Sequence, residues 1–260
     1  MTTVGITGAA GGIGSMLVDG LGGQYELTLF DVDNEVKQKY GDAHKTVVAD
    51  LSDEEAIGGL FDGLDVVIHL AASASDRSPW ERVLPHNIVA TYNVFEEARR
   101  ADVKRIVFAS SNHCQNGIAM ADTSTSLTPF YERHRGYIRL DDPPTPTSIY
   151  GVSKLFGENL GWLYHKRHGI QFVGLRIGAT GPSDNVGRSK GTDRESYMRA
   201  MFLSRRDCIE VFKRAIEVDT EYLITYAISD NDDRIFDMKE TMEKLSFYPQ
   251  DNSKDFFDRA

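Results

Sequence analysis

Short apolar runs alternate with amphipathic stretches along the first two-thirds of the chain. The apolar runs are typical of buried strands, and they are Val4–Thr7, Glu26–Phe30, Thr46–Ala49, Asp65–Leu70, Arg105–Ser110 and Gln171–Ile177. The stretches that separate them have helical spacing, and they lie at 12–22, 53–61, 80–101 and 149–168. This alternation predicts a parallel sheet with helices on both faces, the doubly wound α/β arrangement called the Rossmann fold.

The pattern becomes looser after Ile177. A stretch containing Gly, Ser and Arg at 178–196 is followed by a predicted helix near Ser204–Glu217, a strand near Glu221–Ile228 and a helix near Met238–Leu245. With 260 residues, of which 41% are apolar, the chain can bury one sizeable core. We therefore expect residues 1–177 to form a nucleotide-binding core, and residues 178–260 to form a small substrate-side cap that does not fold independently.

Charge and cysteine content exclude several classes of function. The net charge is −10 and the pI is near 5.2, which disfavours a nucleic-acid or membrane-surface protein and favours a small-molecule partner. Cys114 and Cys208 are the two cysteines, and they form neither a disulfide framework nor a metal-binding spacing. We expect no metal and a cytoplasmic location. No apolar stretch approaches the roughly 18–20 residues that span a bilayer, so we expect a soluble protein.

Glycines follow the first predicted strand directly and open the first predicted helix. Such glycines permit a tight turn and let backbone N–H groups approach a pyrophosphate at a helix N-terminus. The residues concerned are Gly8, Gly11, Gly12, Ile13 and Gly14. A glycine-rich loop alone is a weak signal, but its place between a strand and a helix makes it a specific one.

An acidic residue, Asp31, ends the second predicted strand about twenty residues after the glycines. A carboxylate there hydrogen-bonds the adenosine ribose and repels a 2′-phosphate, which favours NAD over NADP. The alternative is that Asp31 only opens a polar turn with Asp33 and Asn34. Further cofactor-side candidates follow later strands, and they are Asp50, Leu51, Leu70, Ala71, Ala72 and Ile177. His69, inside an apolar run, is expected to be structural.

The pair Tyr150 and Lys154 predicts acid–base chemistry. Four residues apart on a helix, both side chains can reach the same cleft. A nearby ammonium favours the phenolate, and a phenol pKa lowered from about 10 to about 6–7 gives a usable base at neutral pH. The pair alone also occurs by chance in many helices, so its context matters.

Taken together, Gly8, Gly11, Gly14, the 110–113 segment and the Tyr150/Lys154 pair resemble the extended short-chain dehydrogenase/reductase family across nearly the whole chain. The phrases Phe108–His113, Tyr150–Glu158 and Leu175–Gly178 are similar to those of uronate dehydrogenases and of archaeal short-chain NAD-dependent glucose-6-phosphate dehydrogenases. Arg139–Asp141, Ile228–Asn231 and Tyr248–Ser253 are similar to the second group in particular.

The resemblance implies oxidation of the anomeric C1 hydroxyl of an aldose to a lactone. In that reaction Tyr150 is the base, Ser111 holds the C1 oxygen, and Lys154 binds the nicotinamide ribose and lowers the tyrosine pKa. Asn87 is implied in a proton relay or in the geometry of the cofactor side. The implied sugar contacts are Ser75, Asn112 and His113. The helices at 80–101 and 149–168 resemble those of a family dimer interface, so we expect a homodimer.

Two departures from the uronate dehydrogenases bear on the sugar. Tyr197 stands where those enzymes carry a carboxylate-binding arginine, with Arg194 and Arg199 nearby, and Ala179 stands in place of a serine. The connection from Cys114 to Thr147 is longer and basic, with Arg133, His134, Arg135 and Arg139. Guanidinium groups there suit a phosphate; a solvated loop or a subunit contact is the alternative. We take Arg133, Arg135 and Arg199 as candidate anion ligands.

The leading hypothesis is an NAD-dependent dehydrogenase that acts at C1 of a hexose 6-phosphate or a hexuronate. One alternative is a neutral aldose 1-dehydrogenase, with arabinose or galactose as examples. Another is a nucleotide-sugar epimerase or dehydratase, which normally has a larger C-terminal domain than the roughly eighty residues after Ile177. A cofactor-binding protein without catalysis is the remaining alternative, and the intact serine, tyrosine and lysine do not favour it.

Overall fold

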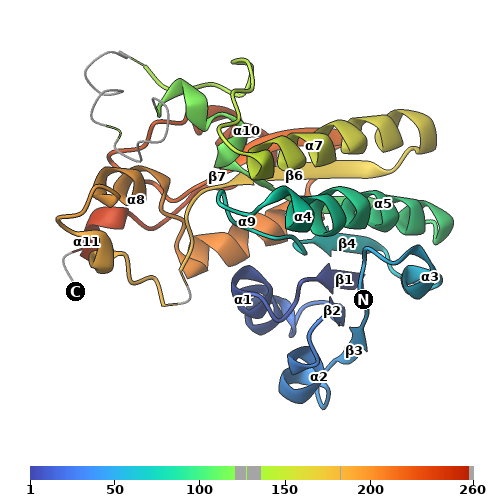
Figure 1. Cartoon of the computed structure of the whole chain (residues 1–260). Coiled ribbons are helices and arrows are strands. Elements are labelled where there is room, and N and C mark those ends of the chain that lie inside the picture. The colour runs from blue at the N-terminus through green and yellow to red at the C-terminus, as the bar shows by residue number, and fades with distance from the viewer. Residues whose placement is uncertain (121–126, 128–135, 182, 258–260) are drawn as a thin grey trace.

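The computed structural model describes residues 1–120, 127, 136–181 and 183–257. One sheet of seven parallel strands has the order β3-β2-β1-β4-β5-β6-β7 (Figure 1). The strands are β1 (Thr3–Thr7), β2 (Glu26–Asp31), β3 (Lys45–Val48), β4 (Val66–His69), β5 (Arg105–Ser111), β6 (Gln171–Ile177) and β7 (Tyr222–Ala227). The strand order reverses between β1 and β4, and ligands of such sheets bind at the carboxyl ends beside that reversal. The predicted fold class is confirmed.

Alternate residues of the central strands enter separate cores on the two faces of the sheet. In β5, Ile106 and Phe108 pack on one face, while Val107 and Ala109 pack on the other. The first face is covered by α3 (Glu54–Ile57), α5 (Ala90–Arg100) and α7 (Ile149–His168). The second is covered by α1 (Gly12–Leu21), α9 (Arg205–Glu217) and α10 (Lys239–Leu245). Strands buried on both faces explain why the sequence shows continuous apolar runs.

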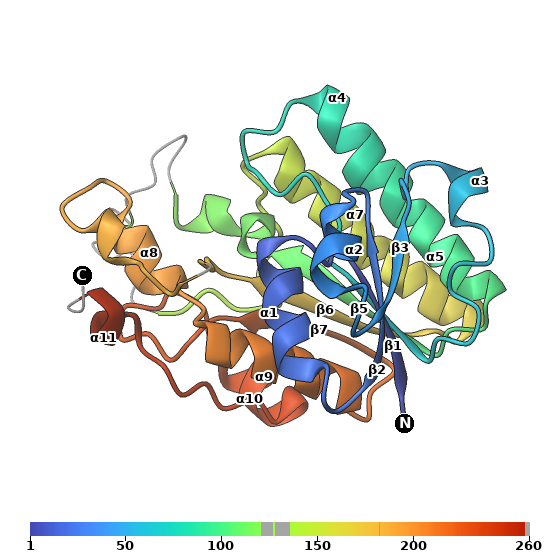
Figure 2. The same cartoon turned by 90° about the horizontal axis from the view of Figure 1, so that it is seen from below.

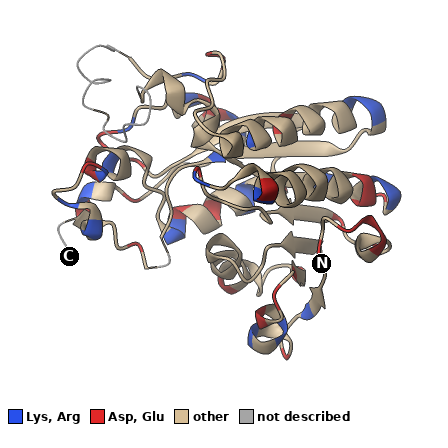
Figure 3. Ribbon diagram, in the orientation of Figure 1, with Lys and Arg blue, Asp and Glu red and all other residues tan. Residues whose placement is uncertain are grey.

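Two glycines let α7 lie unusually close to the sheet. A methyl group at Gly157 would come within 2.2 Å of the Phe108 ring, and one at Gly161 within 2.4 Å of the Phe172 ring. Figure 1 shows α5 and α7 side by side over this face. Both helices carry basic residues in their last turns, which Figure 3 shows in blue. These positive charges complement the negative C-terminal ends of the helix dipoles.

The structure corrects several predicted helices. The expected helix at 80–101 consists of α4 (Trp80–Val83), a π-helical turn η1 (Leu84–Val89) and α5; Pro85, which lacks an N–H, lies in that turn. The expected helix at 53–61 is only the short α3, followed by Gly58 and Gly59. The helix α2 (Glu35–Tyr40) was not expected. Its sequence is mostly polar, and only two of its side chains, Val36 and Tyr40, are buried in the structure.

The segment after Ile177 also contributes to the core, beyond the cap that the sequence suggested. β7 is the seventh strand of the sheet, and α9 packs against α1. The remaining helices, α8 (Glu195–Met201) and α11 (Ser253–Phe257), lie beside each other beyond the carboxyl ends of the strands (Figure 2). In the described part of the chain, every helix is too short or too polar to cross a membrane.

Candidate active site

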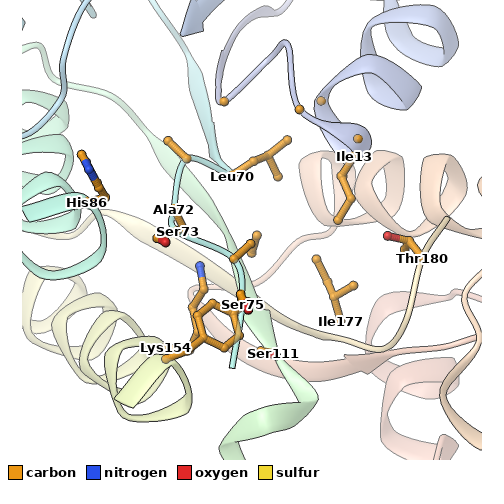
Figure 4. Close-up of a pocket in the computed structure, with 18 of the residues that line it drawn as sticks. Ile13, Leu70, Ala72, Ser73, Ser75, His86, Ser111, Lys154, Ile177 and Thr180 are labelled. Atoms are coloured by element: carbon orange, nitrogen blue, oxygen red, sulfur yellow. The ribbon is translucent and has the colours of Figure 1, made fainter. Parts of the chain in front are cut away.

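A cleft of about 1040 Å³ opens at the carboxyl ends of the strands, where the strand order reverses. One wall comes from the glycine loop and α1, and the other from the segments after β4, β5 and β6 together with the start of α7. Figure 4 shows Lys154, Ser111 and Ser75 on one side of this space, with Ile13, Ile177 and Thr180 across from them. Its lining extends from the glycine loop to Tyr150.

The glycine loop has the geometry of a pyrophosphate cradle. Gly8 has a φ of +69°, and a Cβ there would lie 2.9 Å from the backbone N of Ala71. A Cβ at Gly14 would lie 2.4 Å from the carbonyl oxygen of Gly8. Helix α1 begins after Gly11 without a side-chain cap or an acidic residue in its first turn. Its N–H groups are therefore available to an anion, which fits a dinucleotide.

Asp31 opens the polar turn that the sequence offered as the alternative, and it also reaches the glycine loop. Its Oδ2 accepts a hydrogen bond from the N–H of Ala10 at 2.9 Å, and its Oδ1 accepts one from the N–H of Asp33 at 3.1 Å. The side chain thus fixes the glycine loop and the following turn. It also lines the cleft, where a carboxylate suits a ribose and repels a phosphate.

The structure brings nearly all of the predicted cofactor-side residues to this cleft. Those that line it are Gly8, Gly11, Gly12, Ile13, Gly14, Asp31, Asp50, Leu51, Leu70, Ala71, Ala72, Tyr150, Lys154 and Ile177. His69 has the structural role expected of it, because it is buried with its ring nitrogens 2.8 Å from Thr7 Oγ1 and 3.1 Å from Thr91 Oγ1.

Asn87 lies behind the cleft wall rather than in it. Its Oδ1 accepts a hydrogen bond from the N–H of Ser73 at 2.8 Å, and its Nδ2 donates one to Ser153 Oγ at 2.9 Å. These bonds join the loop after β4 to helix α7 next to Lys154. In this structure the residue braces the cofactor side, and it does not itself line the cleft.

Local sequence positions Tyr150 and Lys154 on the first two turns of α7. Ser148 caps the helix by accepting a hydrogen bond from the N–H of Gly151 at 3.1 Å. Both side chains are buried and line the cleft, with Ser111 at the end of β5 lining it as well. The Nζ atom of Lys154 lies 4.9 Å from the centre of the Phe108 ring and 5.6 Å from that of Tyr150.

Burial sets the protonation of this pair. It raises the pKa of Tyr150 to about 12, against a smaller lowering by a hydrogen bond with Ser111. Burial also lowers the pKa of Lys154 to about 8. The protein alone therefore does not produce the low phenol pKa that the sequence led us to expect.

A buried ionic network, which sequence analysis missed, fixes α7 against the sheet. Glu158 lies one turn beyond Lys154, and its carboxylate receives two hydrogen bonds from Arg176 on β6, at 2.9 Å and 2.8 Å. Ser110 Oγ donates to the same carboxylate at 2.5 Å. Arg176 also donates to Gln115 Oε1 at 2.6 Å. The network joins β5, β6 and α7 directly beneath Ser111 and Lys154.

The opposite end of the cleft is lined by polar side chains from distant segments. Ser75, Asn112 and His113, all predicted sugar contacts, line this end. Burial lowers the pKa of His113, so its imidazole is neutral at physiological pH. Tyr197 of α8 closes the wall, and its Oη accepts a hydrogen bond from Asn112 Nδ2 at 2.7 Å. Asp76, Thr180 and Arg194 also line the cleft, although no sequence motif marked them.

The candidate anion ligands are placed less favourably. Arg133 and Arg135, together with His134, lie outside the described residues. Arg199 pairs with Glu195 at 2.8 Å and stacks over Phe257, away from the cleft lining. Arg139 pairs with Asp141 on the exposed surface. Of the arginines at the sugar end, Arg194 is the one that the described structure brings to the cleft. The described residues contain no cluster of His, Cys, Asp and Glu suited to a metal.

Comparisons with known proteins agree with this architecture. The model of the NAD dependent epimerase/dehydratase family matches residues 4–211. The chain is 38% identical to L-arabinose 1-dehydrogenase (NAD(P)(+)) of Haloferax volcanii, over 97% of this chain and 98% of that protein. It is 37% identical to the NAD-dependent glucose-6-phosphate dehydrogenase of the same organism, over 96% and 94%. The crystal structure of uronate dehydrogenase from Agrobacterium tumefaciens superposes with a TM-score of 0.81 at 29% identity, covering 100% of this chain and 88% of that one.

Proposed function

The chain belongs to the NAD dependent epimerase/dehydratase family, and on that premise we propose that it is an NAD-dependent aldose 1-dehydrogenase. It oxidises the C1 hydroxyl of an aldose to the lactone, with reduction of NAD to NADH and release of one proton. The similar proteins named above are dehydrogenases for arabinose, glucose 6-phosphate and uronates, so the reaction class is common to all three.

The observation that carries this proposal is the convergence of Ser111, Tyr150 and Lys154 on one cleft. When bound, NAD supplies the hydride acceptor for the carbon that is oxidised. Tyr150 removes the proton from the C1 hydroxyl, and Ser111 holds the same oxygen by a hydrogen bond. The Lys154 ammonium binds the nicotinamide ribose and favours the phenolate through its charge. The aromatic packing on Phe108 and the brace at Asn87 keep the lysine in place.

We assign NAD as the preferred cofactor because of Asp31. Its carboxylate lines the cleft at the end of β2, and its hydrogen bond to the N–H of Ala10 fixes it beside the glycine loop. A 2′-phosphate placed there meets a negative charge without a compensating cation among the described lining residues of that turn. A kcat/KM for NAD at least tenfold above that for NADP is expected.

The segment after Ile177 argues against a nucleotide-sugar epimerase. After Ile177, β7 and α9 complete the sheet core, which leaves chiefly the region around α8 and α11 to bind a substrate. That region suits a single sugar better than a nucleotide with its sugar. Tightly retained NAD after purification, with turnover of a UDP-sugar, would reverse this conclusion.

We also propose that the protein is a homodimer in a reducing cytoplasm. Large apolar side chains are exposed along two neighbouring helical segments, and they are Trp80, Leu84, Val89 and Tyr92 on α4–α5 with Ile149, Val152, Trp162 and Leu163 on α7. Apolar surface of this extent favours a partner of the same shape. Light scattering that gives the mass of a monomer at micromolar concentration would contradict the dimer. Cys114 and Cys208 are both free and buried, which suits a reducing compartment.

The test is NADH formation by the purified protein with a panel of sugars. The panel contains arabinose, galactose, glucose, glucuronate, galacturonate and glucose 6-phosphate, each with NAD and with NADP. Activity on at least one sugar, with the lactone as product, is expected. Absence of activity on every sugar, together with turnover of a UDP-sugar, would assign the protein to the epimerases instead.

A further inference from the structure

The hydroxyl of Tyr197 is a polar group of the cleft that the reaction above does not use. The side chain is 6% exposed, comes from α8 and lines the sugar end. Its Oη accepts a hydrogen bond from Asn112 Nδ2 at 2.7 Å, and Asn116 is a second side chain that hydrogen-bonds it. An amide nitrogen only donates, so the bond from Asn112 leaves the O–H proton of Tyr197 free to donate elsewhere. No hydrogen bond from this proton is found among the described residues; the Oδ1 atom of Asn116, likewise buried without a partner, is the protein acceptor with which a sugar hydroxyl competes.

Asn112 gives this hydroxyl a fixed position relative to the reacting atoms. It follows Ser111 directly, its side chain is buried, and Ser111 Oγ lies 3.3 Å from its Oδ1. The residue that holds the C1 oxygen ends β5 and caps the turn η2 (Asn112–Cys114), and the residue that orients Tyr197 is the first of that turn. A sugar bound with C1 at Ser111 presents a more distant hydroxyl to Tyr197.

The charges around this end of the cleft nearly cancel. Asp76 and Arg194 both line it, and both are exposed. They act with opposite sign on the pKa of His113 and on that of Tyr197, so each lies near both side chains. In the described part of the chain, the buried groups at this end are the hydroxyl of Tyr197 and the amide of Asn112, which are neutral, and burial lowers the pKa of the half-buried His113 beside them. Among the described residues, a carboxylate or phosphate in this place loses water without gaining a buried cation, which is costly.

We propose, on the basis of the proposed function, that Tyr197 selects the substrate: its O–H, oriented by Asn112, donates a hydrogen bond to a hydroxyl of a neutral aldose. The enzyme then prefers neutral aldoses to hexuronates and to hexose 6-phosphates. This reverses the order that the sequence suggested, since the leading hypothesis there was a sugar with an anion at C6.

The experiment compares the wild type with Tyr197→Phe and Tyr40→Phe on the sugar panel described above. Tyr40 is the matched control, because its hydroxyl is buried without a partner and lies outside the cleft lining. In the wild type, kcat/KM is expected to be highest for a neutral aldose. Y197F should lower kcat/KM for that sugar about 10- to 100-fold, mainly through KM, which is the size of one lost buried hydrogen bond. Y40F should leave it unchanged.

Deoxy analogues of the preferred sugar separate recognition from a structural role. For the analogue that lacks the hydroxyl bound by Tyr197, wild type and Y197F should have the same kcat/KM. If Y197F lowered kcat/KM equally for all sugars and all analogues, Tyr197 would only pack the cleft wall, and the proposal would be overturned. A higher kcat/KM of the wild type for a uronate or for glucose 6-phosphate would also overturn this proposal, but it would leave the proposed aldose dehydrogenase function intact. No NADH from any sugar would overturn both.

Discussion

The two ends of the cleft are built in different ways. The cofactor end is made of short segments that follow β1 to β4, and close backbone packing at Gly8 and Gly14 sets its shape. The sugar end is made of side chains that come from distant parts of the chain, as the bond between Asn112 and Tyr197 shows. Recognition of the cofactor is therefore a local property of the sequence, whereas recognition of the sugar depends on tertiary contacts.

Removing the base is expected to separate the two ends most clearly. Tyr150→Phe should lower kcat by about 10³-fold, because a positioned general base contributes about 10²–10⁴-fold. Affinity for NAD, measured by fluorescence titration, should change little, since the phenyl ring still packs against Lys154. A variant that keeps substantial turnover would mean that another group is the base. A large loss of NAD binding would mean that the two ends are not independent.

The buried network beneath both ends should give the largest loss of stability. Glu158→Ala leaves Arg176 buried without its carboxylate, which is expected to cost about 3–5 kcal/mol of unfolding free energy. Glu240→Ala is the control, because its pair with Lys244 is exposed and should contribute less than about 1 kcal/mol. Urea unfolding measures both. Equal losses for the two variants would show that burial of the network has no special consequence.

Backbone packing at the cofactor end predicts a contrast between two neighbouring glycines. Gly14→Ala places a methyl group against the carbonyl of Gly8, and overpacking of this kind costs about 1–3 kcal/mol. Gly12→Ala meets no atom within 4 Å and should leave the melting temperature of the cofactor-free protein nearly unchanged. If both variants melt alike, the close approach of loop and helix is not what stabilises this end.

The smallest expected effect is a pH dependence of stability from Lys154. Its folded pKa of about 8 lies below its ordinary value of 10.5, so between these values the unfolded state binds more protons and stability rises with pH. Tyr150 acts in the opposite direction only above pH 10, because its pKa is raised from 10.0 to about 12. Burial raises the pKa of Cys114 and Cys208 from 9.0 to about 12, which opposes this rise above pH 9. The lysine is therefore isolated by comparison: in urea unfolding without cofactor, the change in stability from about pH 7.5 to about pH 9.5 should be more favourable in the wild type than in Lys154→Met. An unchanged slope in that variant would assign the rise to another group.

Much of the cofactor end could be predicted from the sequence. Strand β6 begins and ends where the apolar run does, and the other five predicted strands agree with β1–β5 within about two residues at each end. The glycine loop and Asp31 could be placed because each lies next to a strand end. Helix α2 could not, because its pattern of Val36 and Tyr40 on a polar background is too short to give a clear period.

The sugar end could be predicted only in part. Ser111, Tyr150 and Lys154 belong to motifs, and His113 follows one of them in sequence. The resemblance flagged Tyr197 and Arg194 only by their position, and their place in the cleft could not be predicted, because it depends on how α8 and the residue before it fold over the sheet ends. The pairing of Glu158 with Arg176 was equally hidden, because eighteen residues and two different elements separate them. Such contacts depend on tertiary packing that no local pattern describes.

The most direct test of the proposed function follows the hydrogen that leaves the sugar. An aldose that the protein oxidises is supplied with deuterium at C1, and the reduced cofactor is analysed by mass spectrometry or NMR. Deuterium in NADH, with a slower rate than for the unlabelled sugar when hydride transfer limits turnover, is the predicted result. Deuterium that stays in the sugar product while NADH forms from another position would contradict oxidation at C1.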